Sequence, residues 1–227
     1  MNPAWSSSRP KAPPQPLQTN TMPLISFEGI DGCGKSTQIQ KLKDALEASG
    51  RTVYLFREPG GTPLSEEIRE MLLDNRRTIH PVTEMILFSA ARADLITQQV
   101  EPLLQKGEWV ILDRFYDSTT AYQGYGRQAA PIGKLQHLNH LATLGVVPEL
   151  TFYLRVDLET ALQRRNGQKA DRMEGAGDDF FERVIHGYDL MARQEPQRIT
   201  VLDASQPVEQ VFGDLMAALK HHFEEIG

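Results

Sequence analysis

The chain has 227 residues, of which 40% are hydrophobic and 24% charged, a composition that fits one globular domain, or one domain with a tail. No apolar run approaches the ~20 residues of a membrane-spanning helix, and the balance of residue types excludes a fibrous or wholly disordered protein. The formal net charge is −6, and an acidic surface repels nucleic acid, so neither a nucleic acid nor a membrane is an expected partner.

The first segment of the chain, residues 1–21, is rich in Pro, Ser and Gln and poor in large apolar side chains. Because burial cannot offset its ordering entropy, we predict a disordered leader there, followed by a folded domain at 22–227. Cys33 is the only cysteine, so no intrachain disulfide can form. Together with the lack of a signal-like apolar stretch, this favours a cytoplasmic location.

From Leu24 onward, short apolar runs alternate with amphipathic stretches, an order typical of strands joined by crossover helices. The apolar runs predict strands at 24–28, 52–56, 109–113, 150–156 and 199–203. The amphipathic stretches predict helices at 35–48, 64–73, 82–106, 133–144, 157–165, 179–194 and 207–224. Pro102 should bend or end the third of these helices, because proline lacks an N–H. We therefore expect one α/β domain built on a five-stranded parallel sheet flanked by helices.

The first predicted strand runs directly into a glycine-rich sequence, GIDGCGKS, which satisfies the pattern GxxxxGK[ST] before a predicted helix. Glycines let the backbone turn its amide groups toward phosphate oxygens, and the helix that follows directs its positive end at them. Lys35 would reach the β and γ phosphates, and the Ser36 hydroxyl would bind magnesium. The pattern predicts a P-loop NTPase three-layer sandwich with these ATP phosphate-binding residues: Gly29, Ile30, Asp31, Gly32, Cys33, Gly34, Lys35, Ser36 and Thr37.

Asp113 closes the apolar run of the third predicted strand, where a carboxylate can hold magnesium or its water shell. A helix-capping aspartate is the alternative reading, but Arg114 follows at once and would face the same crevice. A triphosphate site alone is compatible with GTPases, motor ATPases, sulfotransferases and small-molecule kinases, so further residues must decide among them.

Four more segments are informative together with this loop: FREPGGT at 56–62, FSAAR at 88–92, DRF at 113–115 and STTAYQGYGR at 118–127. In this order and at this spacing they resemble thymidylate kinase of the bacterial kind, over essentially all of residues 23–222. The resemblance implies a P-loop nucleoside monophosphate kinase that transfers the γ-phosphoryl group of ATP to dTMP, with Mg²⁺ as cofactor. It also implies a homodimer.

The resemblance assigns a dTMP site to particular residues of this chain. Arg57 and Arg114 match positions that hold the acceptor phosphate, a role that suits the planar guanidinium group. Phe88 matches a ring that stacks on thymine, and Arg92, one helical turn on, matches a residue that hydrogen-bonds the base. The remaining assigned contacts to the acceptor nucleotide are Asp31, Ser118, Thr119, Tyr122 and Gln123. Glu58 would orient either metal-bound water or Arg57.

Residues at about 164–175 interrupt the helical pattern with polar and basic side chains and resemble the mobile lid of these kinases. In some members of the family a basic residue occupies the loop position that is Gly32 here, whereas in others the lid supplies the charge. Arg164, Arg165 and Arg172 are therefore catalytic candidates beside Lys35 and Arg114. The sequence does not say which of them reaches the phosphoryl group.

Two alternatives remain open at the level of sequence. The acceptor is dTMP or another nucleoside monophosphate, and a panel of monophosphates would separate the two. A nucleotide-dependent switch or assembly ATPase is the rival from another class, and it would give Arg57, Arg92 and Arg114 no shared purpose.

Overall fold

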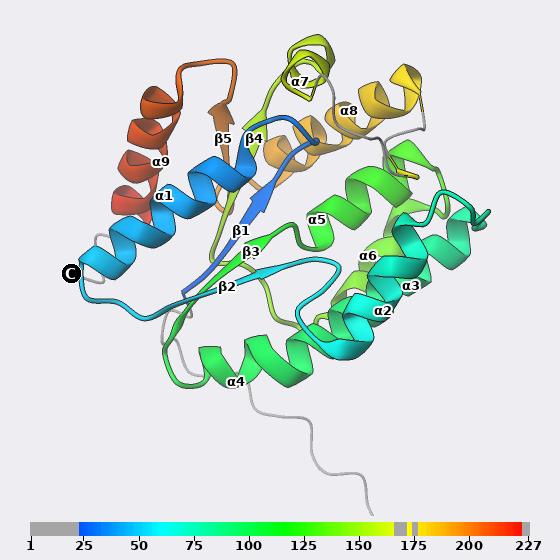
Figure 1. Ribbon diagram of the computed structural model, residues 1–227, viewed down its shortest axis with the longest axis horizontal. Coiled ribbons are helices and arrows are strands. Elements are labelled where there is room, and N and C mark those ends of the chain that lie inside the picture. The colour runs from blue at the N-terminus through cyan, green and yellow to red at the C-terminus, as the bar shows by residue number, and fades with distance from the viewer. Residues whose placement is uncertain (1–22, 166–171, 174–176, 224–227) are drawn as a thin grey trace, which may run out of the picture.

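The computed structural model describes residues 23–165, 172–173 and 177–223, and Figure 1 shows this part of the chain as a sheet with helices around it. The predicted leader at 1–21 and most of the predicted lid lie outside the described residues. The strands are β1 (Leu24–Glu28), β2 (Val53–Arg57), β3 (Trp109–Asp113), β4 (Leu150–Arg155) and β5 (Ile199–Asp203). All neighbouring pairs are parallel, in the order β2-β3-β1-β4-β5, so the predicted five-stranded parallel sheet is confirmed.

The helices of the described residues follow the predicted pattern closely. In chain order they are α1 (Lys35–Ala48), α2 (Pro63–Leu73), α3 (Pro81–Leu95), α4 (Glu101–Leu104), α5 (Tyr116–Thr119), α6 (Ile132–Ala142), α7 (Leu158–Arg164), α8 (Asp178–Gln194) and α9 (Val208–Phe223), with π-helical segments η1 (Ile96–Val100) and η2 (Thr120–Gly126). Among these helices, none combines the length and the apolar character needed to cross a membrane.

The three inner strands β1, β3 and β4 bury side chains on both faces, which explains why they read as apolar runs rather than as alternating patterns. The edge strands β2 and β5 leave some apolar side chains exposed, among them Tyr54, Leu55 and Val201. On one face Ile25 and Phe27 of β1 pack with α1 and α9, and on the other Leu24 packs with η1 and α4. Figure 1 shows α1 and α9 together on one side of the strands, with α4 on the other. The three layers of helix, sheet and helix are those of a P-loop α/β protein.

The third predicted helix is interrupted before Pro102 rather than at it. Between α3 and α4 the chain forms η1, in which the N–H of Glu101 bonds to the carbonyl of Ile96, five residues back. Pro102 then lies in the first turn of α4, where a helix does not require its missing N–H. The helix therefore changes its hydrogen-bond spacing instead of ending.

The carboxyl ends of β2, β3 and β1 lie next to one another and position the site. Arg57 of β2 is in register with Asp113 of β3, and Asp113 is in register with Phe27 of β1. The three loops that follow these strands therefore begin at the same edge of the sheet, where α/β proteins bind their ligands.

Candidate active site

The loop from β1 to α1 has the backbone path expected of a phosphate cradle. Gly32 has a φ of +88°, and a Cβ added to it would lie 2.4 Å from the carbonyl oxygen of Ala161, so only glycine fits. Lys35 is buried beneath the loop, and its Nζ donates to the carbonyl oxygens of Gly29 at 3.0 Å and Ile30 at 3.3 Å. The loop thus ends at the amino end of α1 with a positive charge beside it, an arrangement that suits phosphate.

A cavity of about 870 Å³ opens in front of this loop. Asp31, Gly32, Cys33, Gly34, Lys35, Ser36 and Thr37 all line it, whereas Gly29 and Ile30 lie below and contribute the carbonyl groups that hold Lys35. The far wall is formed by Arg164, Arg165 and residues 204–208, which follow β5. The cavity therefore extends beyond the phosphate loop, toward the segment between β5 and α9.

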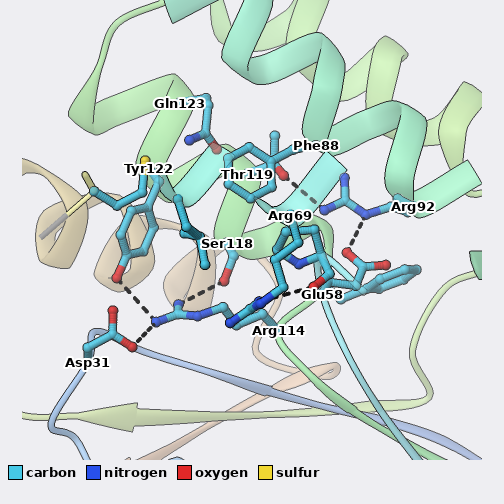
Figure 2. Close-up of a pocket in the computed structure, with 14 residues that line it drawn as sticks. Asp31, Glu58, Arg69, Phe88, Arg92, Arg114, Ser118, Thr119, Tyr122 and Gln123 are labelled. Atoms are coloured by element: carbon cyan, nitrogen blue, oxygen red, sulfur yellow. Dashed lines mark hydrogen bonds and ion pairs between the residues drawn. The ribbon is translucent and has the colours of Figure 1, made fainter. Parts of the chain in front are cut away.

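A second pocket adjoins this cavity and contains almost all of the predicted acceptor residues (Figure 2). Its walls are formed by Asp31, Glu58, Pro59, Arg69, Leu73, Phe88, Arg92, Arg114, Phe115, Ser118, Thr119, Tyr122, Gln123 and Met173. Arg57 is the one predicted acceptor residue that does not line it, and it lines the larger cavity instead. The two spaces share four charged residues, Asp31, Glu58, Arg69 and Arg114, so the boundary between them is highly charged.

Arg114 lies at this boundary in a left-handed backbone conformation, with a φ of +71°, which a residue other than glycine adopts at a cost. Its guanidinium donates to the carbonyl oxygen of Gly29 at 2.9 Å and to Asp31 Oδ1 at 2.7 Å, and it lies over the ring of Tyr122. Burial alone would raise the pKa of Asp31, but the nearby positive charges of Arg114 and Lys35 hold that pKa well below its usual range. The negative charge of Asp31 in the phosphate loop is therefore neutralised in large part by Arg114, which lies on the acceptor side.

Arg92 is the centre of a buried polar network at the other end of the pocket, with 1% of its surface exposed. Its Nε donates to Glu58 Oε2 at 2.7 Å, and its two terminal nitrogens donate to Thr119 and Asn139. Burial raises the pKa of Glu58, and the charge of Arg92 opposes that rise. The expectation that Glu58 orients Arg57 is not supported, because Arg57 pairs instead with Glu66, at 2.9 Å.

The side chains predicted to contact a base and sugar gather between these two arginines. Figure 2 shows Phe88, Thr119 and Gln123 toward one end of the pocket, and Asp31 and Arg114 at the opposite end. Phe88 is half-buried and packs against the side chains between α2 and α3. The pocket therefore has an aromatic end, with Phe88 and the paired charges of Arg92 and Glu58, that suits a base, and a cationic end at Arg114 that suits a phosphate.

The three predicted catalytic arginines of the lid segment lie in different places. Arg164 lines the larger cavity and donates to the carbonyl oxygen of Ala204 at 2.8 Å. Arg165 lines the same cavity and runs past Gly32, since a Cβ on that glycine would lie 3.0 Å from Arg165 Cγ. Arg172 is not among the residues that line either space and lies 2.6 Å from Glu84, the partner of Gln123, so its placement does not support a role at the phosphoryl group.

The predicted magnesium ligands, Ser36 and Asp113, both line the larger cavity. Asp113 Oδ1 is buried and has no hydrogen-bond partner in the described part of the chain, and the same holds for Glu58 Oε1. No cluster of three acidic, His or Cys side chains that could hold a metal occurs among the described residues. Mg²⁺ in such sites takes only one or two ligands from the protein and the others from water and phosphate oxygens, so this small set of protein oxygens beside a phosphate loop fits magnesium.

Several residues of the site were given no individual role in the sequence predictions, although Met173 falls within the predicted lid. Arg69 of α2 lines both spaces, and Met173 closes one wall of the acceptor pocket. The sequence places Arg69 three residues after Glu66 on a predicted helix, but only the structure shows that Glu66 pairs with Arg57, so this spacing did not mark Arg69 by itself. Glu84, which holds Gln123, and Glu28, which holds Ser118, carried no motif that could have marked them.

Comparison with known proteins agrees with this geometry. Residues 27–215 match the thymidylate kinase family. The thymidylate kinase of Chlorobaculum tepidum is 47% identical over 206 residues, which cover 86% of this chain and 96% of that protein. Those of Chlorobium luteolum and Caldanaerobacter subterraneus are 45% and 42% identical, covering 89% and 88% of this chain and 99% and 96% of theirs. The chain thus belongs to the thymidylate kinase family.

Proposed function

We propose that this protein transfers the γ-phosphoryl group of ATP to dTMP and releases dTDP and ADP. The observation that carries this function is the junction of two spaces, one in front of the phosphate loop and one with an aromatic end, at Asp31, Glu58, Arg69 and Arg114. A triphosphate in the first and a monophosphate in the second would meet at these charges. A switch or assembly ATPase would have no use for the second space.

Transfer between the two nucleotides needs neither a covalent intermediate nor a general base. The acceptor phosphate already carries a nucleophilic oxygen at neutral pH, so the protein contributes position and charge. Lys35 neutralises the transferred group from the loop side, and Arg114, with Arg57 and Arg69, holds the acceptor phosphate. Arg165 is the lid residue best placed to reach the same charge, because its side chain passes Gly32. Arg164 lies on the side of the cavity that would hold ATP, where it donates to the carbonyl oxygen of Ala204.

At the aromatic end of the pocket, Phe88 stacks on thymine and Arg92 donates to a carbonyl group of the base. Three of the five N–H groups of Arg92 are used by Glu58, Thr119 and Asn139, so two remain for the ligand. Gln123 contacts the base edge. The remaining predicted contacts, to the sugar and its phosphate, are Asp31, Ser118, Thr119 and Tyr122.

Mg²⁺ is the proposed cofactor, with Ser36 and Asp113 as its protein ligands. Glu58 would orient a water molecule bound to the metal. Asp113 Oδ1 is buried and has no hydrogen-bond partner among the described residues. This supports the assignment, because buried polar atoms normally have a partner and a bound Mg²⁺ would supply one. Magnesium bound there would neutralise negative charge on the phosphates of ATP.

We also propose a cytoplasmic homodimer. The outer side of α3 carries Val82 and Ile86, exposed by 36% and 51%, and Ala90 follows one turn further on at the surface. Apolar side chains that recur at helical spacing on an exposed face favour a helix of a second copy as the partner.

The proposed reaction is tested by ADP release, measured with ATP and a panel of dTMP, dUMP, dCMP, AMP and GMP. We expect dTMP to be the best acceptor by kcat/KM. Equal turnover of dTMP and dCMP would remove the thymine assignment and leave a kinase of other monophosphates. If dTMP does not stimulate ADP release at all, the switch or assembly class replaces the kinase.

A further inference from the structure

Glu84 is a buried acidic side chain that the proposed mechanism does not use. It lies in the first turn of α3 and is 1% exposed. Its Oε1 accepts a hydrogen bond from Gln123 Nε2 at 2.8 Å and lies 3.5 Å from Arg127 Nε, while its Oε2 lies 2.6 Å from Arg172 NH1. Two guanidinium groups from separate parts of the chain therefore balance its charge, and its one amide partner comes from the wall of the acceptor pocket.

The contact with Glu84 fixes which way the Gln123 amide faces. A carboxylate accepts hydrogen bonds but does not donate them, so it can face only the NH₂ group of the glutamine. The carbonyl oxygen, Gln123 Oε1, then faces away from Glu84, and Figure 2 shows it on the side of the amide nearer to the Phe88 ring. No described residue donates a hydrogen bond to this oxygen, and Gln123 lines the acceptor pocket. Gln123 Oε1 thus provides the pocket with a hydrogen-bond acceptor.

A hydrogen-bond acceptor fixed at Gln123 Oε1 distinguishes two kinds of pyrimidine base. Thymine and uracil carry an N–H at ring position 3, whereas cytosine has a lone pair there. The fixed oxygen of Gln123 accepts from the first kind and repels the second. A glutamine free to rotate would serve either base, because its two ends exchange donor and acceptor.

We infer that Glu84 is a positioning residue that selects the 2,4-dioxopyrimidine bases over 4-aminopyrimidines, by holding the Gln123 amide in one orientation. The inference rests on the proposed function, since it takes Gln123 as a contact to the base. It goes further, because it assigns the choice of base to a side chain that does not itself touch the nucleotide.

The test compares kcat/KM for dTMP and dCMP in the full-length protein and in Glu84→Gln. An amide at position 84 can donate to Gln123 Oε1, so Gln123 becomes free to turn its NH₂ group toward the base. We expect the ratio of kcat/KM for dTMP to that for dCMP to fall about tenfold or more. In the double variant Glu84→Gln/Gln123→Glu, the contact returns with its polarity reversed and the pocket regains an acceptor oxygen, so the ratio should recover.

Arg172→Gln is the matched control, because it breaks the ion pair of Glu84 but leaves the contact with Gln123. It should change kcat/KM for both nucleotides by the same factor. The inference is overturned if the ratio is unchanged in folded Glu84→Gln, if Arg172→Gln lowers the ratio as much as Glu84→Gln does, or if the ratio does not recover in the double variant. Thermal melting establishes folding, and Glu84→Asp, which withdraws the carboxylate from Gln123, should lower the same ratio if Glu84→Gln does not fold. Turnover of dTMP by the parent protein tests the proposed function separately.

Discussion

The two ends of the crevice are built from different parts of the chain. The loop end is made largely of backbone, with Gly32 allowing close approach and Lys35 held by the carbonyl groups of Gly29 and Ile30. The acceptor end is made of buried side chains, with Arg92 and Glu58 exposed by 1% and 5%. In the proposed function, the loop end would bind phosphate through the path of the main chain, and the acceptor end would bind a nucleotide through buried, paired charges.

This difference has consequences for stability as well as for recognition. A buried ion pair costs desolvation on both sides, so the loss of one member leaves the other charge buried and unpaired. Lys35 at the loop end is held by neutral carbonyl oxygens, and the nearest carboxylate, Asp31, keeps its bond to Arg114 when Lys35 is replaced. Substitutions in the Arg92–Glu58 pair should therefore weaken both folding and binding, while replacement of Lys35 should weaken the reaction more than the fold.

The largest effect is expected for Arg92→Ala, which leaves the Glu58 carboxylate buried without its cation. The free energy of unfolding should fall by about 3–5 kcal/mol, and the affinity for dTMP should fall with it. Urea denaturation and calorimetric titration with dTMP measure the two changes.

The matched control is Arg57→Ala, because Arg57 also pairs with a glutamate but its side chain is 54% exposed. It should cost less than about 1 kcal/mol of stability, since exposed ion pairs contribute little. If both variants lose the same stability, the contrast between the two kinds of pair is wrong.

Lys35→Met should produce the next largest effect, and on catalysis rather than on stability. Removing one charge that stabilises the transferred phosphoryl group is expected to lower kcat by about 10²–10³-fold. Binding of dTMP should persist, because Lys35 does not line the acceptor pocket.

Lys41→Met serves as the control on the same helix, since Lys41 pairs with Glu209 away from the crevice. Its kcat should match that of the parent. A large loss of dTMP affinity in Lys35→Met would show that the two ends are not separable in the way described.

Glu28→Gln extends the comparison to the way in which stability depends on pH. Burial and the nearby charge of Asp117 raise the pKa of Glu28 to about 7, against the hydrogen bonds from Ser118 and Phe115. A carboxyl group with a raised pKa stabilises the fold at pH values below its unfolded pKa, and this contribution is lost as the pH rises through 7. The stability of the parent relative to Glu28→Gln should fall on the order of 3 kcal/mol from pH 4 to pH 8.

Denaturation in urea at a series of pH values measures this difference. Glu67→Gln, which removes an exposed carboxylate of α2, is the control variant. A constant difference between the parent and Glu28→Gln across this pH range would contradict the raised pKa.

The loop end could be predicted from the sequence almost residue by residue, because its determinants are local. Glycine spacing, an apolar strand before it and a helix after it are all read within the segment 24–48. The strands were predicted within one residue of their bounds for the same reason. The change to π-helical spacing before Pro102 escaped prediction, because proline shows that a helix is disturbed but not how the helix adjusts.

The acceptor end was predicted in its members but not in its pairing. Arg92 and Glu58 were both singled out, yet their contact spans 34 residues and depends on how α3 packs against the loop after β2. Arg172 was expected near the transferred phosphate and lies instead beside Glu84, a partner 88 residues away that no motif marks. Choices among possible partners for a charge are made by tertiary packing, which spacing along the chain does not encode.

The strand order also bears on how the chain folds as it is synthesised. β1 is the central strand and the first to leave the ribosome, but Ser26 meets its partner Thr151 only 125 residues later. At bacterial or eukaryotic translation rates this interval is roughly 6–25 s. For that time the apolar segment LISFE has no neighbour on its β4 edge, and the cradle for the phosphates cannot take its final form until most of the polypeptide has emerged.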